Sequence, residues 1–589
     1  MLDFCAEQQV CPIDSQPLKV LKISNKTVHS TILGTFQARH TEYYCPSHRH
    51  LGVFKSGDLE RIVPAGSNFA YDALVEIGKQ RYLHHRQVEE IKSHFKQKFN
   101  LSISNSGIAS QIIKFISYLS IVHLDNMEQI KAYIRAQGGY ILHLDTSCDG
   151  DSPQLTSSID AVSGFVLQSA KYKSENEADI VNFLLSIKEQ LGSPHAIITD
   201  MSRTMIKAVK RVFPDRPHYI CHFHFLRMMG KLLFEEENNN LRKRLSRTGV
   251  NAKLKALKRE LENKYERSLL DNFFQNLNQP VQIPDESPSL EPLVYSLICW
   301  ILDYPSAGNG YGFPFDRSYL EYYLRLQKAR QQVEQFLSMF PYDSPKTKIL
   351  WELRSCMFET TSNKYLWKVV KRYKSKVEVF ERLRRALRAA PQESHHGLSD
   401  LGISSSVKEL KAIEKAVGNF AHYLDKKILL SKNRIIRNSF QQIQKQMNKY
   451  QLMLLSDPIE VESLGKKRLI FINRTNNILE QHFRVFSYNH QRITGNGSMK
   501  KTLKSMHPST PLVMNLKNKN YIRLIFGDEH GIAQKFAQVD VRKIREDIHN
   551  KTAKIFSLSK KSRRLMRDKN FLNKLNIVFE KQYMYAQLT

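Results

Sequence analysis

One stretch of the chain, from residue 140 to residue 223, alternates short apolar runs with amphipathic segments in an order that few folds share. YILHLDTS, QLTSSIDAVSG and FVLQSAKY have the character of strands and are separated by polar turns. ENEADIVNFLLSIKEQLG then repeats apolar residues at helical spacing, and AIITD, a basic helix ending at Phe213 and HYICHF follow. The order β-β-β-α-β-α-β predicts an antiparallel meander that continues into parallel strands.

This order of elements is that of the RNase H fold, in which the first and fourth strands are neighbours. Asp145 ends the first predicted strand and Asp200 ends the fourth. We therefore expect the two carboxylates to meet at one sheet edge, where open α/β sheets present functional groups. The local alternative is that Asp200 or Ser202 only caps the helix that follows.

Two carboxylates at adjacent strand tips repel each other unless a cation lies between them. Oxygen ligands suit hard divalent cations, and two such ions about 3.5 to 4 Å apart catalyse in-line displacement at phosphorus. The pairing predicts two Mg²⁺ ions, which Mn²⁺ could replace, and phosphodiester chemistry.

A third acid is expected from a later helix. FINRTNNILEQHFRVFSYNHQRITGNG contains Glu480 on a helix that Thr475 or Asn476 can cap. Arg484 lies one turn after Glu480 on the same face, and Arg492 follows, so both are candidate DNA-binding residues.

Other acids near Asp145 have more ordinary interpretations. DTSCDGDSPQLT resembles an EF-hand loop, but Thr156 stands where calcium requires a glutamate, so Asp149 and Asp151 are expected to be turn residues that could supplement the site. Asp160 is the alternative first acid, although its position before a turn favours a structural role.

The charge of the chain indicates its partner. Among 589 residues, 89 Lys and Arg stand against 57 Asp and Glu, which gives a formal charge of +32 and favours nucleic acid. Seven cysteines without an apolar leader indicate a reducing compartment, namely the nucleoid-associated cytoplasm of a bacterium or the nucleus of a eukaryote. No membrane-spanning segment is expected.

The first 60 residues predict a zinc-ribbon-like domain. Cys5, Cys11, Cys45 and His48 surround strand-like segments, and His50 could replace His48. Because the spacing is irregular, unligated cysteines in a small β domain are the alternative.

Residues 65–135 predict a helix-turn-helix domain. One helix has Val88, Ile91, Phe95 and Phe99 on one face, and a second begins after a cap at Ser104 or Ser106. Helical hairpins unrelated to DNA have the same pattern.

The rest of the chain is expected to be mostly helical and basic. Residues 236–465 form a predicted helical insertion, part of which we expect to follow a DNA backbone. Its three tryptophans, Trp300, Trp351 and Trp367, are expected in the core, with stacking on an unpaired base as the alternative. Loop and strand-like structure is expected over residues 500–527, and a basic helical tail over residues 531–589.

HLDTSCDGD, ITDMSRTMIKAVKRVFPDRPHYICHFHFLR and RTNNILEQHFRVFSYNHQRITGNG together resemble the DDE transposases of the Mutator-like superfamily and related bacterial insertion-sequence transposases. The resemblance implies a multidomain α/β plus α protein with an RNase H-like core at 138–235 and 466–530, split by the helical insertion. It implies Asp145, Asp200 and Glu480 as the catalytic triad and places the superfamily's CxxH signature at Cys221 and His224. With only one such pair nearby, we expect a structural or DNA-orienting role for Cys221 and His224 rather than a metal site.

The sequence therefore predicts a DNA transposase that binds terminal inverted repeats, cleaves the element ends and transfers the 3′-hydroxyl strand to target DNA. The resemblance implies a homodimer or larger assembly. A catalytically silent or domesticated DNA-binding regulator, and an RNase H-fold nuclease without strand transfer, are the alternatives.

Overall fold

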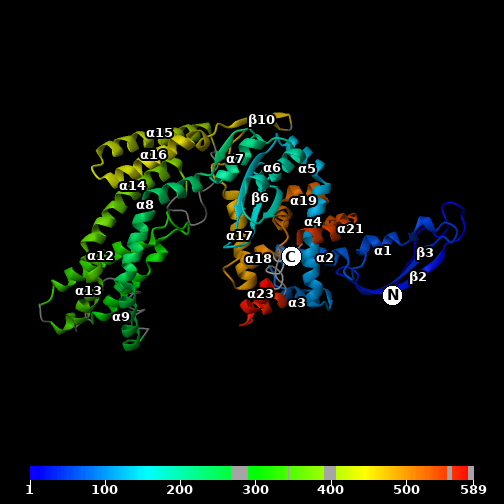
Figure 1. Cartoon of the computed structure of the whole chain (residues 1–589), viewed down its shortest axis with the longest axis horizontal. Coiled ribbons are helices and arrows are strands. Elements are labelled where there is room, and N and C mark those ends of the chain that lie inside the picture. The colour runs from blue at the N-terminus through cyan, green and yellow to red at the C-terminus, as the bar shows by residue number, and fades with distance from the viewer. Residues whose placement is uncertain (267–288, 342–343, 390–405, 464, 553–559, 581–589) are drawn as a thin grey trace, which may run out of the picture.

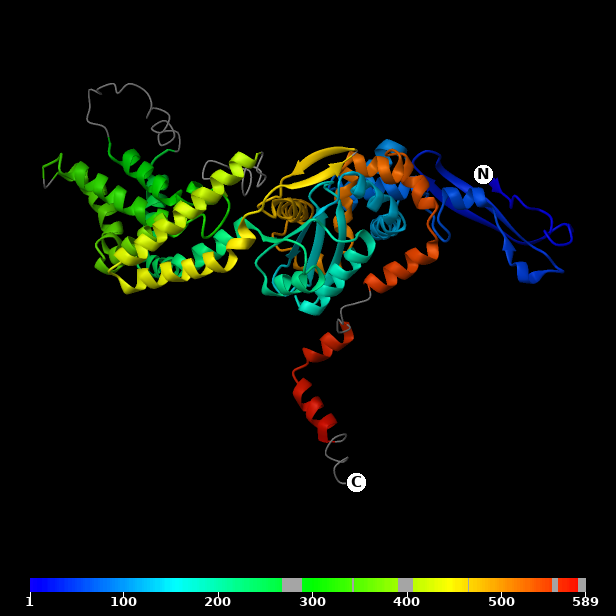
Figure 2. The same ribbon diagram turned by 90° about the horizontal axis from the view of Figure 1, so that it is seen from above.

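The computed structural model describes residues 1–266, 289–341, 344–389, 406–463, 465–552 and 560–580. It has three main parts (Figure 1). A small β module lies at the N-terminal end, a mixed α/β core lies in the middle, and a long helical arm extends from the other side of the core. From above, the last helices project away from the core (Figure 2).

A five-stranded sheet forms the centre of the core. Its strands are β5 (Ile141–Ser147), β6 (Gln154–Asp160), β7 (Val166–Tyr172), β8 (Ala196–Thr199) and β9 (His218–Ile220), in the order β7-β6-β5-β8-β9. β5, β6 and β7 pair antiparallel, whereas β5, β8 and β9 pair parallel. The predicted strand order and the pairing of the first and fourth strands are confirmed.

Helices cover both faces of this sheet because its strands are apolar on both sides. Leu142 and Leu144 of β5 belong to the main core, which includes α6 (Glu177–Leu191) and α7 (Arg203–Val212). Ile141 belongs to a separate cluster with Ile472 on the other face.

A second group of helices, from the segments before β5 and after β11 (Lys466–Ile470), packs on the sheet or on the helices that cover it. It comprises α2 (Tyr71–Tyr82), α3 (Val88–Phe99), α4 (Asn105–Asp125), α5 (Met127–Ala136), α17 (Asn477–Thr494), α18 (Lys500–Ser505), the 3-10 helix η4 (Thr510–Lys517), α19 (Lys519–Phe526), α20 (Gly531–Ala537) and α21 (Val541–Thr552). The two helices predicted in the helix-turn-helix segment are present as α3 and α4, and Ser104 caps α4 by accepting a hydrogen bond from Gly107 N–H (3.1 Å).

α4 is long and apolar enough to cross a membrane by length and composition alone. Its packing gives another reason for that composition. Phe115 and Leu119 are fully buried in the main core, and Tyr118 stacks on Phe536 of α20. The central position of α4 therefore accounts for its apolar surface.

The N-terminal module is a four-stranded sheet with one short helix. It contains β1 (Leu2–Phe4), β2 (Lys19–Ser30), β3 (Gly34–Tyr44), η1 (Arg49–Leu51), β4 (Val53–Phe54) and α1 (Gly57–Ile62). Val28, Ala38 and Leu59 are buried together between the sheet and the helix.

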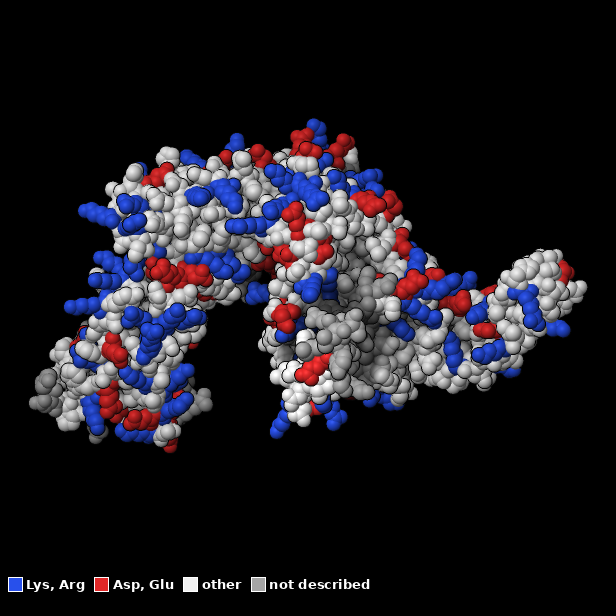
Figure 3. Space-filling view, viewed as in Figure 1, with Lys and Arg blue, Asp and Glu red and all other residues white. Residues whose placement is uncertain are grey.

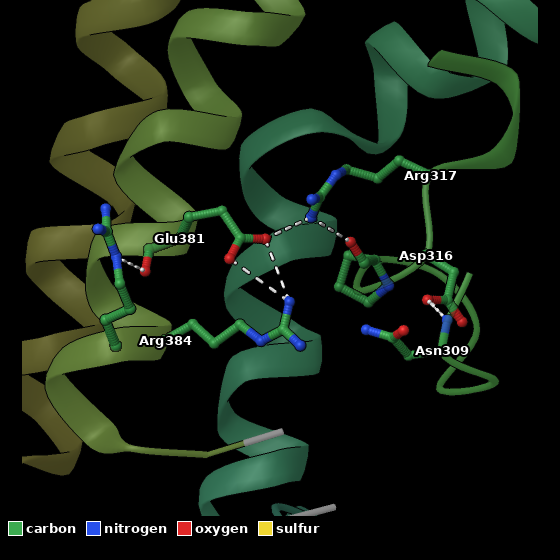
Figure 4. Close-up of polar contacts among 7 residues, drawn as sticks. Asn309, Asp316, Arg317, Glu381 and Arg384 are labelled. Atoms are coloured by element: carbon green, nitrogen blue, oxygen red, sulfur yellow. Dashed lines mark hydrogen bonds and ion pairs between the residues drawn. The ribbon is translucent and has the colours of Figure 1, made fainter. Parts of the chain in front are cut away.

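The arm is a bundle of helices with its own hydrophobic core. Its described helices are α8 (His222–Arg247), α9 (Val250–Lys264), α11 (Glu291–Leu302), η2 (Tyr304–Ala307), α12 (Ser318–Leu337), η3 (Pro345–Thr347), α13 (Lys348–Thr361), α14 (Lys364–Leu387), α15 (Val407–Leu430) and α16 (Arg434–Leu454). Figure 4 shows a charged contact inside it: Arg317 Nη1 donates to Glu381 Oε1 of α14 (2.8 Å), and Arg384 donates to the same carboxylate.

Three predicted elements differ from the structure in extent or type. The expected strand HYICHF ends at Ile220, because Cys221 is the N-cap of α8. The loop and strand-like closure expected over residues 500–527 is helical, as α18, η4 and α19. The insertion is not helical to its end, since β10 (Ile459–Ser463) and β11 (Lys466–Ile470) form a hairpin beside the core.

The three tryptophans are also less buried than expected. Trp300, Trp351 and Trp367 are 40%, 38% and 52% exposed. Each has a cationic side chain over its ring, namely Arg325, Arg354 and Lys371 respectively. The basic tail includes α21, α22 (Lys560–Met566) and α23 (Phe571–Phe579), while residues 553–559 lie outside the described part.

Candidate active site

The register between β5 and β8 places Asp145 next to Asp200. His143 of β5 pairs with Ile198 of β8, and each aspartate lies two residues further along its own strand direction. Because the strands are parallel, both carboxylates emerge at the same edge of the sheet. Asp145 is 6% exposed and accepts a hydrogen bond from Thr146 N–H at Oδ1 (2.8 Å).

Asp200 is not the cap of the following helix. Ser202 is the N-cap of α7, and its hydroxyl accepts from Met205 N–H (3.4 Å). Asp200 Oδ1 accepts from Ser202 N–H (2.9 Å), which orients the carboxylate in a turn before the helix. The alternative that one of these residues caps the helix is therefore correct for Ser202 and wrong for Asp200.

Glu480 lies in the first turn of α17, on the helix that packs against β5 and β6. Its Oε1 is 3.4 Å from His224 Nδ1 of α8. The charge of Asp200 acts on Glu480, and the charges of Asp200 and Glu480 act on Asp145. Three acids that are far apart in the sequence thus lie within electrostatic reach of one another.

Burial and the charges of neighbouring acids raise the pKa values of all three acids. Burial, followed by the charges of Asp200 and Glu480, raises the pKa of Asp145 well above its usual range. Burial raises the pKa of Asp200 to about 6 and that of Glu480 to about 7, even though Arg227 acts to lower the latter. A bound cation would relieve the cost of ionising these groups, so this donor set of carboxylate oxygens fits hard divalent cations.

Asn476 connects the start of α17 to the strand of Asp145 and to the segment of Cys221. Its Oδ1 accepts from His143 Nδ1 (2.9 Å), and its Nδ2 donates to Leu144 O (3.0 Å), both on β5. Its backbone N–H donates to Cys221 Sγ (3.1 Å). Asn476 is the N-cap residue of α17, as the sequence predicts as one possibility, but its buried side chain bonds to the strand of Asp145 and not to the helix amides.

The CxxH pair lies at the same place. Cys221, His224 and Glu480 form a group whose potential ligand atoms lie within 4.8 Å of one another. Burial raises the pKa of the Cys221 thiol and lowers that of His224 to about 4, with Arg227 acting in the same direction on His224. The neutral Cys221 thiol accepts a hydrogen bond from Asn476, and the neutral His224 imidazole lies beside Glu480. The two side chains can therefore orient Glu480 without binding a metal.

Two residues at this edge had no predicted role. Glu175, in the loop before α6, accepts a hydrogen bond from the Ser202 hydroxyl, and its charge acts on both Asp145 and Asp200. Arg227, one turn after Phe223, lies over that ring and is the cation that acts on Glu480. Neither has a local sequence signal, because only the folded chain brings each to the acids.

The remaining acids near Asp145 have structural partners. Asp149 Oδ2 accepts from Ser498 Oγ (2.8 Å) and Met499 N–H (2.7 Å), and Asp151 pairs with Lys500 and Lys504. Asp160 is fully buried and accepts from Val162 N–H, Ser163 N–H and the Ser163 hydroxyl. Asp149 and Asp151 thus tie the loop after β5 to α18, and Asp160 closes the turn after β6.

The two predicted DNA-binding arginines, Arg484 and Arg492, lie on α17 and are exposed. Neither forms an ion pair with a described acid. They therefore present free positive charge on the helix that carries Glu480.

A second group of potential ligands lies in the N-terminal module. Cys11, Asp14, Cys45 and His48 have ligand atoms that all lie within 4.8 Å of one another. His48 Nδ1 is 3.5 Å from Cys11 Sγ, 3.6 Å from Cys45 Sγ and 3.4 Å from Asp14 Oδ2, which suits tetrahedral zinc. Cys5, one of the predicted ligands, is exposed and outside this group, and Asp14 occupies the fourth position.

Comparison with known proteins identifies the class to which the core is similar. Residues 164–228 match the family described as the MULE transposase domain. This confirms the resemblance to Mutator-like transposases, over a span that runs from β7 into α8 and includes Asp200, Cys221 and His224.

The other comparisons add less. No curated protein sequence matches the chain. Among solved structures, the Drosophila P element transposase strand transfer complex is similar with a TM-score of 0.33 and 9% sequence identity, covering 79% of this chain and 96% of that chain.

Proposed function

We propose that this protein is a DNA transposase with an RNase H-like core, and that Asp145, Asp200 and Glu480 are its catalytic triad. The observation that carries the proposal is the meeting of these acids, from β5, the end of β8 and α17, at one buried edge where all three pKa values are raised. Sites that perturb several acids together are typical of catalysis.

In this proposal the three carboxylates bind two divalent cations, Mg²⁺ or Mn²⁺. Such cations, when bound, stabilise the entering and leaving oxygens of an in-line displacement. Asn476 and His224 position Glu480 relative to Asp145. Arg484 and Arg492 bind phosphates of the DNA strand. Cleavage at an element end and attack by the resulting 3′-hydroxyl then use the same residues.

The other parts of the chain serve DNA recognition in this proposal. The N-terminal module binds zinc through Cys11, Asp14, Cys45 and His48, and it acts with the α3–α4 helices on the terminal inverted repeats. The charge of +32 supports a DNA partner. Two element ends must be held together, so the active form is a homodimer or larger assembly, in the nucleus or at the nucleoid.

The test is an assay of DNA nicking and joining with Mg²⁺ or Mn²⁺, on plasmids that carry the DNA flanking the coding sequence on each side. We expect the wild type to nick and to form joined products, and Asp200→Asn and Glu480→Gln to lose both while still binding DNA. Asp215→Asn, an exposed acid beyond α7, is the matched control and should retain activity.

The outcomes separate the candidate functions. Binding by the wild type without cleavage under either metal would contradict the proposal and favour a regulator. Nicks without joined products would instead indicate a nuclease that hydrolyses DNA.

A further inference from the structure

A cavity of about 840 Å³ lies in the helical arm, outside the acidic site. It is formed where α8 ends and α9 begins, against the start of α12 and the segment before it. Four cations line it: Arg242, Lys243, Arg247 and Lys255. None of the described residues that line the cavity is Asp or Glu.

The cations of this cavity differ from others in the arm. Arg317, Arg325, Arg330 and Arg354 each form an ion pair with a glutamate. By contrast, none of the four cavity cations forms an ion pair or side-chain hydrogen bond with another described residue. The cavity therefore concentrates positive charge that the described protein does not neutralise.

The N-terminus of α9 adds backbone donors to the same cavity. Its N-cap is Gly249, which lies in the left-handed region at φ 64°. Because glycine has no side chain, no side chain caps the helix. The first amides of a helix have no acceptor within it, and the helix dipole favours an anion there. Gly249, Asn251 and Ala252 line the cavity, so these donors face the same space as the cations.

A buried hydroxyl with no described partner belongs to one of the residues that line the cavity. Tyr322 lines the cavity and is 3% exposed, yet its hydroxyl has no hydrogen-bond partner among the described residues. Leaving a buried hydroxyl unsatisfied costs about 1 to 3 kcal/mol, so such groups usually have a partner. An acceptor oxygen in the cavity would provide one.

Aromatic rings form the other wall. The Tyr304 and Tyr322 rings lie 4.5 Å apart, and Tyr319 lines the cavity beside them. The segment that leads from Tyr304 to Tyr319 is held by Asp316, whose carboxylate accepts from Asn309 N–H (2.8 Å) and Gly312 N–H (2.7 Å), as Figure 4 shows in part. The wall is therefore supported independently of any ligand.

We propose that this cavity binds a phosphate group of a DNA strand, with the adjoining nucleoside against the tyrosine rings. The inference rests on the proposed function, since it takes DNA as the phosphate-bearing partner, and it deepens that function by assigning a second DNA contact in the arm. Cations, amide donors and a hydroxyl suit phosphate oxygens, and aromatic rings suit bases. Figure 3 shows an open space between the arm and the core.

Three variants of the full-length protein test the site. Arg247→Ala with Lys255→Ala removes two cavity cations. Lys231→Ala with Arg259→Ala is the matched control, because it removes two exposed cations from the same two helices outside the cavity. Tyr322→Phe removes only the hydroxyl and leaves the ring in the core. The probes are a mixed-sequence duplex, a single strand of the same length, and a mononucleotide.

The measurement is binding as a function of salt. We expect the cavity double variant to make the slope of log affinity against log salt less steep, by an amount that corresponds to about two lost phosphate contacts. The control double variant should leave the slope unchanged. Tyr322→Phe should weaken DNA binding about fivefold, the effect of one lost hydrogen bond.

Unchanged DNA affinity and salt slope in both cavity variants would overturn the inference. Cavity-dependent binding of the mononucleotide, with unchanged binding of DNA, would also overturn it. If the cavity variants bind DNA like the wild type while the wild type still nicks DNA, only this inference fails. If the wild type binds DNA through the cavity and never cleaves it, the proposed catalytic function fails instead.

Discussion

Two sets of candidate metal ligands, one in the N-terminal module and one proposed at the edge of the core sheet, differ in chemistry. Cys11, Asp14, Cys45 and His48 combine two thiols, an imidazole and a carboxylate within about 40 residues of sequence. Asp145, Asp200 and Glu480 offer only carboxylates, and together they span more than 300 residues of sequence. The first set suits zinc, and the second suits Mg²⁺ or Mn²⁺.

We expect this difference to separate a metal that stabilises a fold from metals that take part in a reaction. Four ligands around one point leave no open position, which is the arrangement of structural zinc. Three carboxylates at a sheet edge leave coordination positions for water and for DNA oxygens. We therefore expect loss of the first metal to unfold a module and loss of the second to stop a reaction.

The largest effect is expected from Cys45→Ser. Structural zinc contributes on the order of 10 kcal/mol to the folding of small modules, so losing a thiolate should release the metal and unfold the N-terminal module. Zinc content and limited proteolysis measure this. A variant that keeps a full equivalent of zinc and resists protease like the wild type would contradict a structural zinc site.

Asn476→Ala should reduce DNA nicking about 100-fold. The substitution removes the hydrogen bonds to His143 and Leu144, so α17 is no longer held in register with the strand of Asp145. Single-turnover nicking rates at saturating Mg²⁺ measure it, and Asn496→Ala, an exposed position after α17, is the control. Equal rates for the two variants would show that Asn476 does not position the acids.

The stability of the cation-free protein should depend on pH through the acidic cluster. Because the folded-state pKa values of Asp200 and Glu480 are raised to about 6 and 7, the folded state binds more protons than the unfolded state above about pH 4. The free energy of unfolding should therefore fall as pH rises from about 4 to 7, by on the order of 2 kcal/mol.

Thermal unfolding in EDTA across this pH range measures that slope. Asp200→Asn should flatten it, and Mn²⁺ should restore stability to the wild type at neutral pH but not to the variant. A wild-type slope equal to that of Asp200→Asn would mean that the pKa of Asp200 is not raised in the folded protein.

The smallest effect is expected from Cys5→Ser. Cys5 is exposed and outside the ligand group, so the substitution should change the free energy of unfolding by less than about 0.5 kcal/mol and leave zinc content unchanged. The same zinc and proteolysis assays apply. Loss of zinc in this variant would place Cys5, and not Asp14, in the site.

Much of the core could be predicted from sequence because its apolar runs and amphipathic segments are distinct and follow one another in a clear order. The strand order around Asp145 and Asp200 followed from the alternation of apolar runs and amphipathic helices, and the register of β5 and β8 then brings the two acids together. Glu480 required the resemblance to known transposases, since nothing local distinguishes it from a surface acid.

What could not be predicted depends on contacts made only in the folded chain. Glu175 and Arg227 have no motif, and they reach the acids through a loop and a helix placed by tertiary packing. The NYIRLIF segment has the residues of a strand, yet it forms α19, where Tyr521 is buried against His123. In the N-terminal module, the prediction took Cys5 as a ligand and did not consider Asp14, because cysteine is the commoner zinc ligand.

The most direct test of the central claim is Mn²⁺ binding measured by electron paramagnetic resonance in the presence of DNA, with the wild type, Asp200→Asn and the control Asp215→Asn. The account predicts that the wild type and Asp215→Asn bind two Mn²⁺ ions per chain and that Asp200→Asn loses at least one of them. Equal Mn²⁺ binding by all three proteins would show that Asp200 is not a ligand and would contradict the proposed catalytic site.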